Sequence, residues 1–463
     1  MNSNELETLI RTIVSEKLQP ALRDKATSAL FDDVDQAVGA AHAAFLAYQQ
    51  CPLKTRSGII AALRRDLGPP HLQALAERGA EETGMGNAED KLLKNRVALA
   101  NTPGVEDLVT DAFTGDEGMV LFEYSPFGVI GSVAPSTNPT ETIINNCISM
   151  LAAGNTVFFS PHPGAKNVSL WLIEQIEAII FTACGIHNLV TCVREPSVES
   201  TQQMMRHPRI ALLAVTGGPA IVNMALHSGK KTIGAGAGNP PSLVDETAII
   251  DKAAQDIVSG AAFDYNLPCT AEKSLIVVDS VADALLTEMR KCGALLVTDH
   301  DHIDKLRRLA IIDGHANKAA VGKSPAALLG MAGLPAPGKA PRLLLAEVSA
   351  DDPLVMVEQL MPILPVVRVK DFDDALALAL KVEGGLHHTA TMHSQNVSRL
   401  NKAARLLQTS IFVKNGPSYA GIGVGAEGFT TFTIATPTGE GTTSARHFAR
   451  HRRCVLKNAF SIR

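Results

Sequence analysis

The sequence predicts an α/β protein with two doubly wound domains, and three observations support this prediction. From Met119 onward, short apolar runs alternate with helical stretches, which is typical of parallel sheets covered by helices. A second alternation of the same kind starts after Pro240. The chain has 463 residues, of which 46% are hydrophobic and 19% are charged, so it is long and apolar enough to bury more than one core.

The composition excludes several classes of protein. The net charge is −5, so no basic field would attract nucleic acid or an anionic membrane. The seven cysteines are odd in number and form no CxxC pair, so we expect neither a disulfide framework nor a metal site. The best candidate for a membrane helix, Val168–Cys184, is interrupted by Glu174 and Glu177, and the N-terminus has no signal-peptide pattern. We therefore expect a cytosolic protein.

The spacing of apolar residues predicts a separate amphipathic helix at residues 1–18, and the weakly patterned stretch after it predicts a linker at residues 19–30. Asn4 can cap this helix and Pro20 discourages its continuation. A helix this short needs a partner for its apolar face. That partner is either its own domain or another protein, and periodicity alone favours neither. The apolar face consists of Leu6, Leu9, Ile10, Ile13, Val14 and Leu18.

From Phe31 to about Asp111 the pattern is helical, and strands alternate with helices after it. The chain divides near Gly238–Pro241, which places one domain at residues 31–238 and a second at residues 239–434. The first series of predicted strands is Met119–Glu123, Val129–Ala134, Thr156–Ser160, Leu189–Val193, Ile210–Thr216 and Leu243–Val244. The second series is Ser274–Val278, Arg342–Glu347, Leu364–Lys370, Thr389–Met392 and Ser410–Val413.

Two glycine-rich segments are candidate ligand contacts. The segment Val215–Pro219 closes a strand and opens a helix, where bare amides favour a phosphate, although an ordinary tight turn fits it nearly as well. The segment Gly234–Pro241 has five residues without bulky side chains or charge before Asn239, which suits backbone lying against a ligand or another chain. It is not a Rossmann GxGxxG fingerprint, because no strand-turn-helix unit contains it.

Cys269 is the candidate nucleophile. It follows Pro268 in a predicted turn and precedes the polar run Thr270–Lys273, so we expect it to be exposed at a domain junction. A buried, unreactive cysteine is the alternative. Glu358 precedes a predicted strand and also fits a solvated loop. His387 and His388 are neighbours on a strand and point to opposite faces, so we expect packing roles for them and no shared metal.

Together these motifs resemble the aldehyde dehydrogenase superfamily, and within it the CoA-acylating branch, from about Phe31 to Arg463. The resemblance implies an aldehyde dehydrogenase-like fold, with an NAD-binding domain at 31–238, a catalytic domain at 239–434 and a β oligomerisation extension. Residues 112–130 would lie partly in that extension. Residues 435–463 would return to the NAD domain and supply the oligomerisation strand. The matching segments are Pro135–Thr140, Ala152–Thr156, Ser160–Pro163, Thr216–Gly218, Cys269 and Glu358.

The resemblance also implies the catalytic residues. Cys269 would attack the aldehyde carbonyl, and its backbone N–H would hold the oxyanion together with the side chain of Asn138. A shift of the alignment by one residue would give Thr137 that second role. We expect no metal.

The cofactor-binding residues implied by the resemblance are Ser160, Pro161, Gly217, Gly218 and Glu358, with Glu358 on the nicotinamide ribose. The expected cofactor is NAD, with coenzyme A as cosubstrate. Many relatives have a lysine at the position of Ser160, so its absence leaves NADP as the alternative.

Hydrolytic relatives carry a general-base glutamate where this sequence has Gly234, or Ala235 if the register shifts by one. Neither residue can activate water, so we expect water to release an acyl group slowly. A thiol such as CoA needs no such base. A hydrolytic aldehyde dehydrogenase is therefore the disfavoured alternative.

Two segments, Phe263–Cys269 and Glu5–Arg11, are similar to branch members that oxidise propionaldehyde inside bacterial propanediol-utilisation microcompartments. This resemblance implies that propionaldehyde, CoA and NAD become propionyl-CoA and NADH through a Cys269 thioester. It implies that residues 1–18 bind a shell protein and place the enzyme in a microcompartment in the cytoplasm. The alternatives are an acetaldehyde-specific enzyme of ethanolamine utilisation and an inactive cargo or scaffold protein.

The expected oligomerisation extension also rests on resemblance. Thr438–Thr443 and Cys454–Leu456 resemble the family's oligomerisation region, with the strand near Met119–Tyr124 as its other part. We expect a homo-oligomer.

Overall fold

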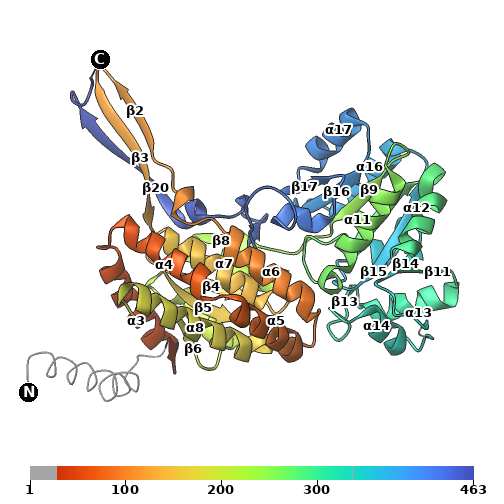
Figure 1. The fold of residues 1–463 in the computed structure, drawn as a ribbon, viewed down its shortest axis with the longest axis horizontal. Helices are drawn as coiled ribbons and strands as arrows, with labels where there is room; N and C mark the ends of the chain where they lie inside the picture. Colours follow the sequence, from red (N-terminus) through yellow and green to blue (C-terminus); the bar gives the residue numbers. More distant parts are fainter. Residues whose placement is uncertain (1–28, 336, 463) are drawn as a thin grey trace, which may run out of the picture.

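The computed structural model describes residues 29–335 and 337–462. The helix expected at residues 1–18 and most of the expected linker lie outside these residues. Ala29 is buried and Leu30 begins a strand, so the folded lobe already includes the last two residues of that linker. Two α/β lobes lie side by side, and a β arm projects away from them (Figure 1).

The first lobe contains a six-stranded parallel sheet in the order β1-β6-β5-β4-β7-β8. All residues of β4, β5 and β6 are buried, which explains why these strands are continuous apolar runs in the sequence. The strands are β1 (Leu30–Phe31), β4 (Val129–Ala134), β5 (Thr156–Pro161), β6 (Val190–Val193), β7 (Ile210–Thr216) and β8 (Thr232–Ala235).

Helices cover both faces of this sheet. Alternate strand residues belong to different apolar cores: Val157 and Phe159 pack in one, and Phe158 packs in the other. The first core is covered by α4 (Leu53–Asp66), α5 (Pro69–Thr83), α6 (Ala88–Asn101), α7 (Pro139–Ala152) and α8 (Lys166–Cys184). The second is covered by α3 (Val34–Tyr48), α9 (Val198–Arg206) and α10 (Pro219–Leu226). Two short 3-10 helices, η2 (Val105–Asp107) and η3 (Pro163–Ala165), follow α6 and β5 in the chain.

Helix α8, with the preceding turn, is long and apolar enough to cross a membrane by length and composition alone. Its apolar residues Val168, Leu172, Ile173, Ile176 and Ile180 are buried in the core of the first lobe. Packing against the sheet therefore accounts for the hydropathy of this helix.

The second lobe contains a seven-stranded parallel sheet in the order β11-β14-β15-β10-β9-β16-β17. Its strands are β9 (Pro241–Val244), β10 (Ser274–Val278), β11 (Ala294–Val297), β14 (Leu343–Glu347), β15 (Ile363–Val369), β16 (Thr389–His393) and β17 (Ile411–Lys414). One face is covered by α11 (Ile250–Ala262) and α12 (Asp279–Lys291). The other is covered by α13 (His300–Ala310), α14 (Pro325–Met331), α15 (Pro353–Met356), α16 (Phe372–Glu383) and α17 (Val397–Leu407), with a small hairpin of β12 (Ile311–Ile312) and β13 (His315–Ala316).

The structure corrects several details of the predicted strands. β11, for which no strand was predicted, pairs with β14 at the edge of the second sheet. Gly234 and Ala235, for which no strand was predicted either, form the end of β8 because their backbone pairs with Val215 and Thr216. Leu243–Val244, counted with the first series, belongs to β9 and pairs in the second sheet. The chain therefore changes lobes between β8 and β9.

The arm is a three-stranded antiparallel sheet of β2 (Asp111–Gly115), β3 (Gly118–Pro126) and β20 (Ala449–Lys457) (Figure 1). After β17 the chain returns to the first lobe, where Phe448 is buried and its carbonyl accepts a hydrogen bond of 2.8 Å from Asn155. The connecting elements are η5 (Ser418–Ile422), β18 (Ile434–Ala435), β19 (Gly441–Thr442) and η6 (Ala445–Phe448).

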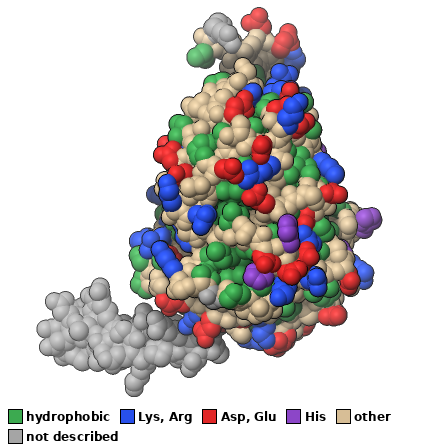
Figure 2. Space-filling view, turned by 90° about the vertical axis from the view of Figure 1, so that its right-hand side faces the viewer, with side chains coloured by type: hydrophobic (Ala, Val, Ile, Leu, Met, Phe, Trp, Pro, Cys, Tyr) green, Lys and Arg blue, Asp and Glu red, His purple; other side chains and the backbone are tan. Residues whose placement is uncertain are grey.

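On the face of the molecule shown in Figure 2, acidic and basic side chains are interspersed. Neither kind gathers into an extended patch on that face. This distribution agrees with the small net charge of −5.

Candidate active site

Cys269 lies in the loop between η4 (Phe263–Asn266) and β10, and its side chain is partly buried. It packs against a small apolar cluster that includes Val97 of α6 in the first lobe, together with Val413 and Phe432. Asn145 of α7 binds the backbone of residues 430 and 432, which holds this part of the chain against the first lobe. Cys269 is therefore placed where the two lobes meet.

The turn before Cys269 has an unusual backbone. Asp264, Tyr265 and Asn266 have φ angles of 46°, 52° and 66°, a left-handed conformation that non-glycine residues rarely adopt. The Asp264 carboxylate accepts a hydrogen bond of 2.8 Å from the Asn87 N–H, and the Asp264 N–H donates one of 2.8 Å to Asp90. Contacts from α6 and the residue that caps it therefore hold this strained turn in place.

Lys273 holds the other side of the same loop. Its Nζ donates to the carbonyl of Asn266 at 2.8 Å, to the Asn266 side chain at 2.6 Å and to the carbonyl of Pro268 at 3.0 Å. Burial lowers the pKa of Lys273 to about 8, although nearby Glu358 and Cys269 raise it. Cys269, which we expected to be exposed because a polar run follows it, is partly buried. The run Thr270–Lys273 is itself buried, with the side chains of Glu272 and Lys273 hydrogen-bonded inside the fold.

The Cys269 thiol is not ionised in advance by its surroundings. Burial raises its pKa to about 12, and the carboxylate of Glu358 adds to this rise. The ammonium groups of Lys273 and Lys94 and its own backbone N–H act in the opposite direction. A proton must therefore leave the thiol before or during attack on a substrate.

Glu358 is the carboxyl group whose charge acts on Cys269 and Lys273. It lies between α15 and β15 and accepts a hydrogen bond of 3.3 Å from the N–H of Gly238, in the segment that joins the lobes. Burial raises the pKa of Glu358 to about 7, while Lys273 and the Gly238 N–H lower it. A carboxyl group with this pKa can accept a proton or a hydrogen bond near neutral pH.

Asn138 precedes the first turn of α7 and is buried. Its Oδ1 accepts a hydrogen bond of 2.6 Å from Lys94, and its Nδ2 lies 3.4 Å from the hydroxyl of Thr137. Lys94 also pairs with Asp264, in the turn that precedes Cys269. One lysine thus connects the predicted oxyanion donor with the predicted nucleophile loop.

Four of the five predicted cofactor residues, all except Glu358, lie at the carboxyl ends of β5 and β7, which flank β4, where open α/β sheets bind ligands. The N–H of Gly217 donates to Ala235 at 3.1 Å, and Gly218 precedes α10 with open space where a Cβ would point. Bare backbone at this helix start fits a dinucleotide phosphate. Pro161 ends β5, and the buried Ser160 hydroxyl is 2.7 Å from Thr201, so its side chain faces the protein.

Gly234 is enclosed by its neighbours. Its N–H donates to Thr438 at 3.1 Å, and a Cβ built on it would lie 3.1 Å from Val222. The general-base glutamate of hydrolytic relatives would not fit this position without displacing these side chains.

Two buried histidines, His388 and His393, pack in the second lobe. The prediction that His387 and His388 share a strand is wrong, because β16 begins at Thr389 and His387 is exposed with a φ angle of 54°. His388 is buried against the backbone of Gly238, and its Nδ1 is 2.9 Å from Thr389. Burial lowers the pKa of both His388 and His393 to about 4, so both rings are neutral. Among the described residues, no group of three His, Cys, Asp or Glu side chains is arranged to hold a metal ion.

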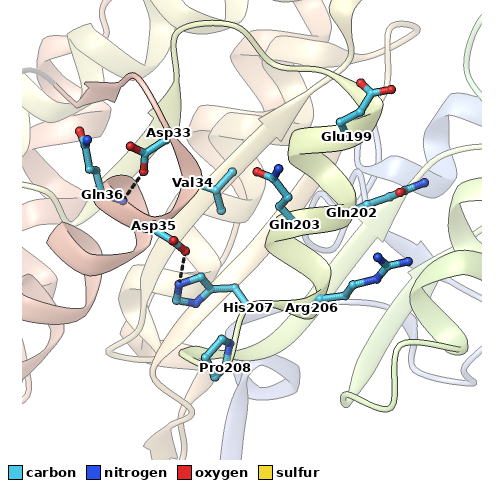
Figure 3. Close-up of a pocket in the computed structure, with 10 residues that line it drawn as sticks. All are labelled: Asp33, Val34, Asp35, Gln36, Glu199, Gln202, Gln203, Arg206, His207 and Pro208. Carbon is cyan, nitrogen blue, oxygen red and sulfur yellow. Dashed lines mark hydrogen bonds and ion pairs between the residues drawn. The ribbon is translucent and has the colours of Figure 1, made fainter.

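A cavity of about 700 Å³ lies away from these residues, in the first lobe (Figure 3). It opens between the start of α3 and one face of α9, and its lining is mostly polar or charged, with Asp35 and His207 paired at 3.1 Å. It contains none of the predicted site residues, so the chemistry is argued from the loop of Cys269.

Sequence reasoning missed two residues of the site, Lys94 and Lys273. Lys94 is one of several polar residues on a helical stretch, and its partners are far from it in the sequence. Lys273 is four residues after the nucleophile and follows Glu272, a pattern that also fits a solvated turn. Only their complete burial in the folded chain distinguishes them.

Comparisons with known proteins agree with this geometry. A model of the aldehyde dehydrogenase family matches residues 18–429. The chain is 70% identical over 463 residues to a propanal dehydrogenase (CoA-propanoylating) from Citrobacter freundii, with 100% of both chains covered.

Two solved structures have similar folds. One is a Rhodopseudomonas palustris propionaldehyde dehydrogenase with bound CoA and an acylated cysteine, with a TM-score of 0.92, 51% identity and coverage of 94% of this chain and 99% of that one. The other is a propionaldehyde dehydrogenase from the Clostridium phytofermentans fucose utilisation bacterial microcompartment, with a TM-score of 0.92, 46% identity and coverage of 94% and 100%.

Proposed function

The chain belongs to the aldehyde dehydrogenase family, and we propose that it converts propionaldehyde, CoA and NAD to propionyl-CoA and NADH. The observation that carries the proposal is the position of Cys269 between the lobes, in a loop held by Lys94, Lys273 and Asp264. This loop offers one sulfur nucleophile to a substrate and a cofactor bound at the ends of the first sheet.

The reaction begins with attack of the Cys269 sulfur on the aldehyde carbon. The thiol proton is released to solvent and is the one proton that the overall reaction produces, because a thiol with a pKa of about 12 is a weak nucleophile until it is deprotonated. A C–S bond forms and the carbonyl oxygen becomes an oxyanion, which the Cys269 N–H and the Asn138 Nδ2–H stabilise. Such a donor contributes about 3 kcal/mol in the transition state.

Gly217, Gly218, Pro161, Ser160 and Glu358 are the proposed cofactor contacts. Bound NAD supplies the acceptor for the hydride that leaves the thiohemiacetal carbon. The charge of Glu358 raises the pKa of the Cys269 thiol, so the two groups lie close together. This position suits a contact between Glu358 and the nicotinamide end of the cofactor. The backbone at Gly218, at the start of α10, suits the phosphates, and Gly217 orients this turn through its hydrogen bond to Ala235. Ser160 acts through its place at the strand end because its hydroxyl faces Thr201.

Loss of hydride leaves a propionyl thioester on Cys269. The CoA sulfur then attacks this carbonyl, the new C–S bond replaces the old one, and the Cys269 thiol is regenerated. Water competes poorly, because Gly234 supplies no general base.

The alkyl group of the substrate would contact the apolar cluster around Cys269, which includes Val97, Val413 and Phe432. These walls suit a short unbranched chain. Acetaldehyde is the second candidate substrate, since one methylene changes binding by only about 1–3 kcal/mol. An inactive scaffold protein is not favoured, because the residues of the site are joined by intact hydrogen bonds and ion pairs.

We also propose that the enzyme works inside a bacterial microcompartment, as the Clostridium phytofermentans relative does. Residues 1–18 would bind a shell protein through their apolar face. Deletion of residues 1–18 should leave kcat and KM unchanged and remove the enzyme from purified shells. Retention of the truncated enzyme in shells would contradict this role.

The test of the reaction is NADH formation by the purified enzyme with propionaldehyde, in the presence and absence of CoA. We expect strict dependence on CoA and propionyl-CoA as the product identified by mass spectrometry. The Cys269→Ala variant should bind NAD and form no NADH. Equal rates without CoA would identify a hydrolytic enzyme and would contradict the inference that Gly234, in place of a general base, makes hydrolysis of the thioester slow.

A further inference from the structure

We propose that Lys94 is a positioning residue for the acylation step, which orients the Asn138 amide toward the oxyanion and ties it to the loop of Cys269. The inference rests on the proposed function, since Asn138 must first be the oxyanion donor. It concerns a residue of α6 that touches neither the substrate nor the cofactor.

The contacts of Lys94 are close and shielded from water. Its side chain is completely buried, and its Nζ lies 2.6 Å from Asn138 Oδ1, 2.6 Å from Asp264 Oδ2 and 3.0 Å from Glu141 Oε1. These three partners come from the start of α7, from the turn before Cys269 and from the third residue of α7. The ammonium group thus donates a hydrogen bond to Asn138 and forms ion pairs with two carboxylates.

The first consequence concerns the orientation of the amide. An asparagine amide can turn over and exchange its oxygen with its nitrogen, at little cost in shape. The ammonium group of Lys94 accepts no hydrogen bond, so only the oxygen can face it. The Nδ2 group is then directed away from Lys94, and one of its hydrogens is available for the oxyanion.

Removal of Lys94 would do more than free this amide. The Glu141 carboxylate would lose its cation and keep the Thr140 hydroxyl, 3.2 Å from Oε2, as a donor, so the freed Asn138 amide would be able to turn its Nδ2 toward this carboxylate. A hydrogen bond to a charged group is stronger than one to a neutral group, so the amide would turn and present its oxygen to the oxyanion. The donor would be lost although Asn138 is still present.

The second consequence concerns the two lobes. Asp264 has a left-handed backbone and immediately precedes the loop of Cys269. Through Asp264 and Asn138, the same ammonium group fixes the nucleophile loop of the second lobe relative to α7 of the first. The nucleophile and the oxyanion donor therefore share one point of attachment.

The neighbouring Lys91 provides a matched control. It is also buried on α6 and also pairs with Asp264 Oδ2, at 3.1 Å, but it has no contact with Asn138. Lys91→Met and Lys94→Met each remove one buried positive charge from the same cluster. A purely structural role would give both variants similar effects.

The experiment is a double-mutant cycle on the rate of NADH formation in the first turnover. Lys94→Met and Lys91→Met are measured in the wild-type enzyme and in Asn138→Ala, with thermal unfolding as the control for folding. We expect Lys94→Met to slow the step about a hundredfold, as loss of an oxyanion donor does, with little change in KM for propionaldehyde. Lys91→Met should slow the same step less than about threefold. In the Asn138→Ala background, Lys94→Met should slow the step little further, because the donor that it positions is already absent.

If Lys94→Met does not fold, Lys94→Met/Glu141→Gln keeps the buried charges balanced, and the same cycle is measured relative to Glu141→Gln. The inference is overturned if Lys94→Met is no slower than Lys91→Met, or if its loss multiplies fully with that of Asn138→Ala. Wild-type activity of Asn138→Ala would overturn the proposed oxyanion donor itself, and this inference with it.

Discussion

Cys269 is surrounded by charges of both signs, and their sum does not produce a thiolate. Glu358 raises its pKa, whereas Lys273 and Lys94 lower it, and burial has the largest effect. The two lysines are occupied by carbonyl, carboxylate and amide oxygens, so they shape the loop more than they charge the sulfur. The residue is therefore placed for attack but depends on the reaction itself to lose its proton.

This environment predicts the pH dependence of Cys269 alkylation. Only the thiolate reacts, so below a pKa of about 12 the rate should rise about tenfold per pH unit. We expect the rate of reaction with iodoacetamide to increase from pH 7 to pH 9 without a plateau, as measured by mass spectrometry of the peptide containing Cys269. Cys292, partly exposed at the end of α12 and away from the arm, is the internal reference in the same digest. A plateau below pH 8 would mean that the enzyme holds a preformed thiolate.

At the scale of elements, the nucleophile loop depends on segments that are distant in sequence. Asp264 is held from α6, and Glu272 accepts hydrogen bonds from the Ser418 N–H at 2.9 Å and the Ser418 hydroxyl at 2.6 Å, at the start of η5. The loop is thus fixed from both sides, between the first lobe and the segment that returns to it.

The buried Glu272 predicts a stability effect. Burial raises its pKa in the folded protein from 4.5 to about 7, so folding favours its protonated form. The stabilisation is fully present below pH 4.5 and is lost as the pH rises through 7, with an upper bound of about 3.5 kcal/mol at about 1.4 kcal/mol per pKa unit.

Glu272→Gln should therefore lose less stability than the wild type between pH 5 and pH 8. The measurement is urea unfolding at both pH values, with Glu288→Gln on α12 as a partly exposed control. If Glu272→Gln lost as much stability between pH 5 and pH 8 as the wild type does, the result would contradict the raised pKa of Glu272.

The elements of the two sheets could largely be predicted from the sequence, because buried parallel strands are continuous apolar runs. Strands β4, β7 and β10 have the predicted bounds. β8 was missed because its last two residues, Gly234 and Ala235, belong to a glycine-rich segment that is also typical of a loop. Its strand structure comes from pairing with β7, which local sequence does not contain.

The candidate site could be predicted only in part. Cys269 was singled out from its place after a predicted turn, whereas Asn138 and Glu358 were assigned roles through the resemblance to the family. Lys94 and Lys273 were not, because a buried lysine is recognised by its partners, and Asn138 and Asp264 lie far from Lys94 along the chain. No periodicity distinguishes such a residue from one on the solvent face of a helix.

At the scale of the whole molecule, the arm is the feature that the lobes do not explain. Eight of the nine residues of β20 are exposed, and apolar side chains such as Phe113 and Val455 face solvent at 62% and 59% exposure. A projecting sheet with an exposed edge and apolar side chains is suited to pairing with another chain. We expect this chain to be a second copy of the enzyme.

Val455→Asp should therefore reduce the mass of the assembly in solution, as measured by size-exclusion chromatography with light scattering. Val397→Asp, on α17 of the second lobe, places the same charge at a similarly exposed valine and should leave the mass unchanged. An unchanged mass for Val455→Asp would place the contact between copies elsewhere.

The central claim is that Cys269 carries the propionyl group until CoA, and not water, removes it. The direct measurement is intact-protein mass spectrometry after mixing the enzyme with propionaldehyde and NAD without CoA. We expect one added propionyl group, located on Cys269 by peptide mapping, that persists in buffer and disappears within seconds of adding CoA as propionyl-CoA forms. An adduct that water removes as fast as CoA does, or an adduct on another residue, would contradict the account.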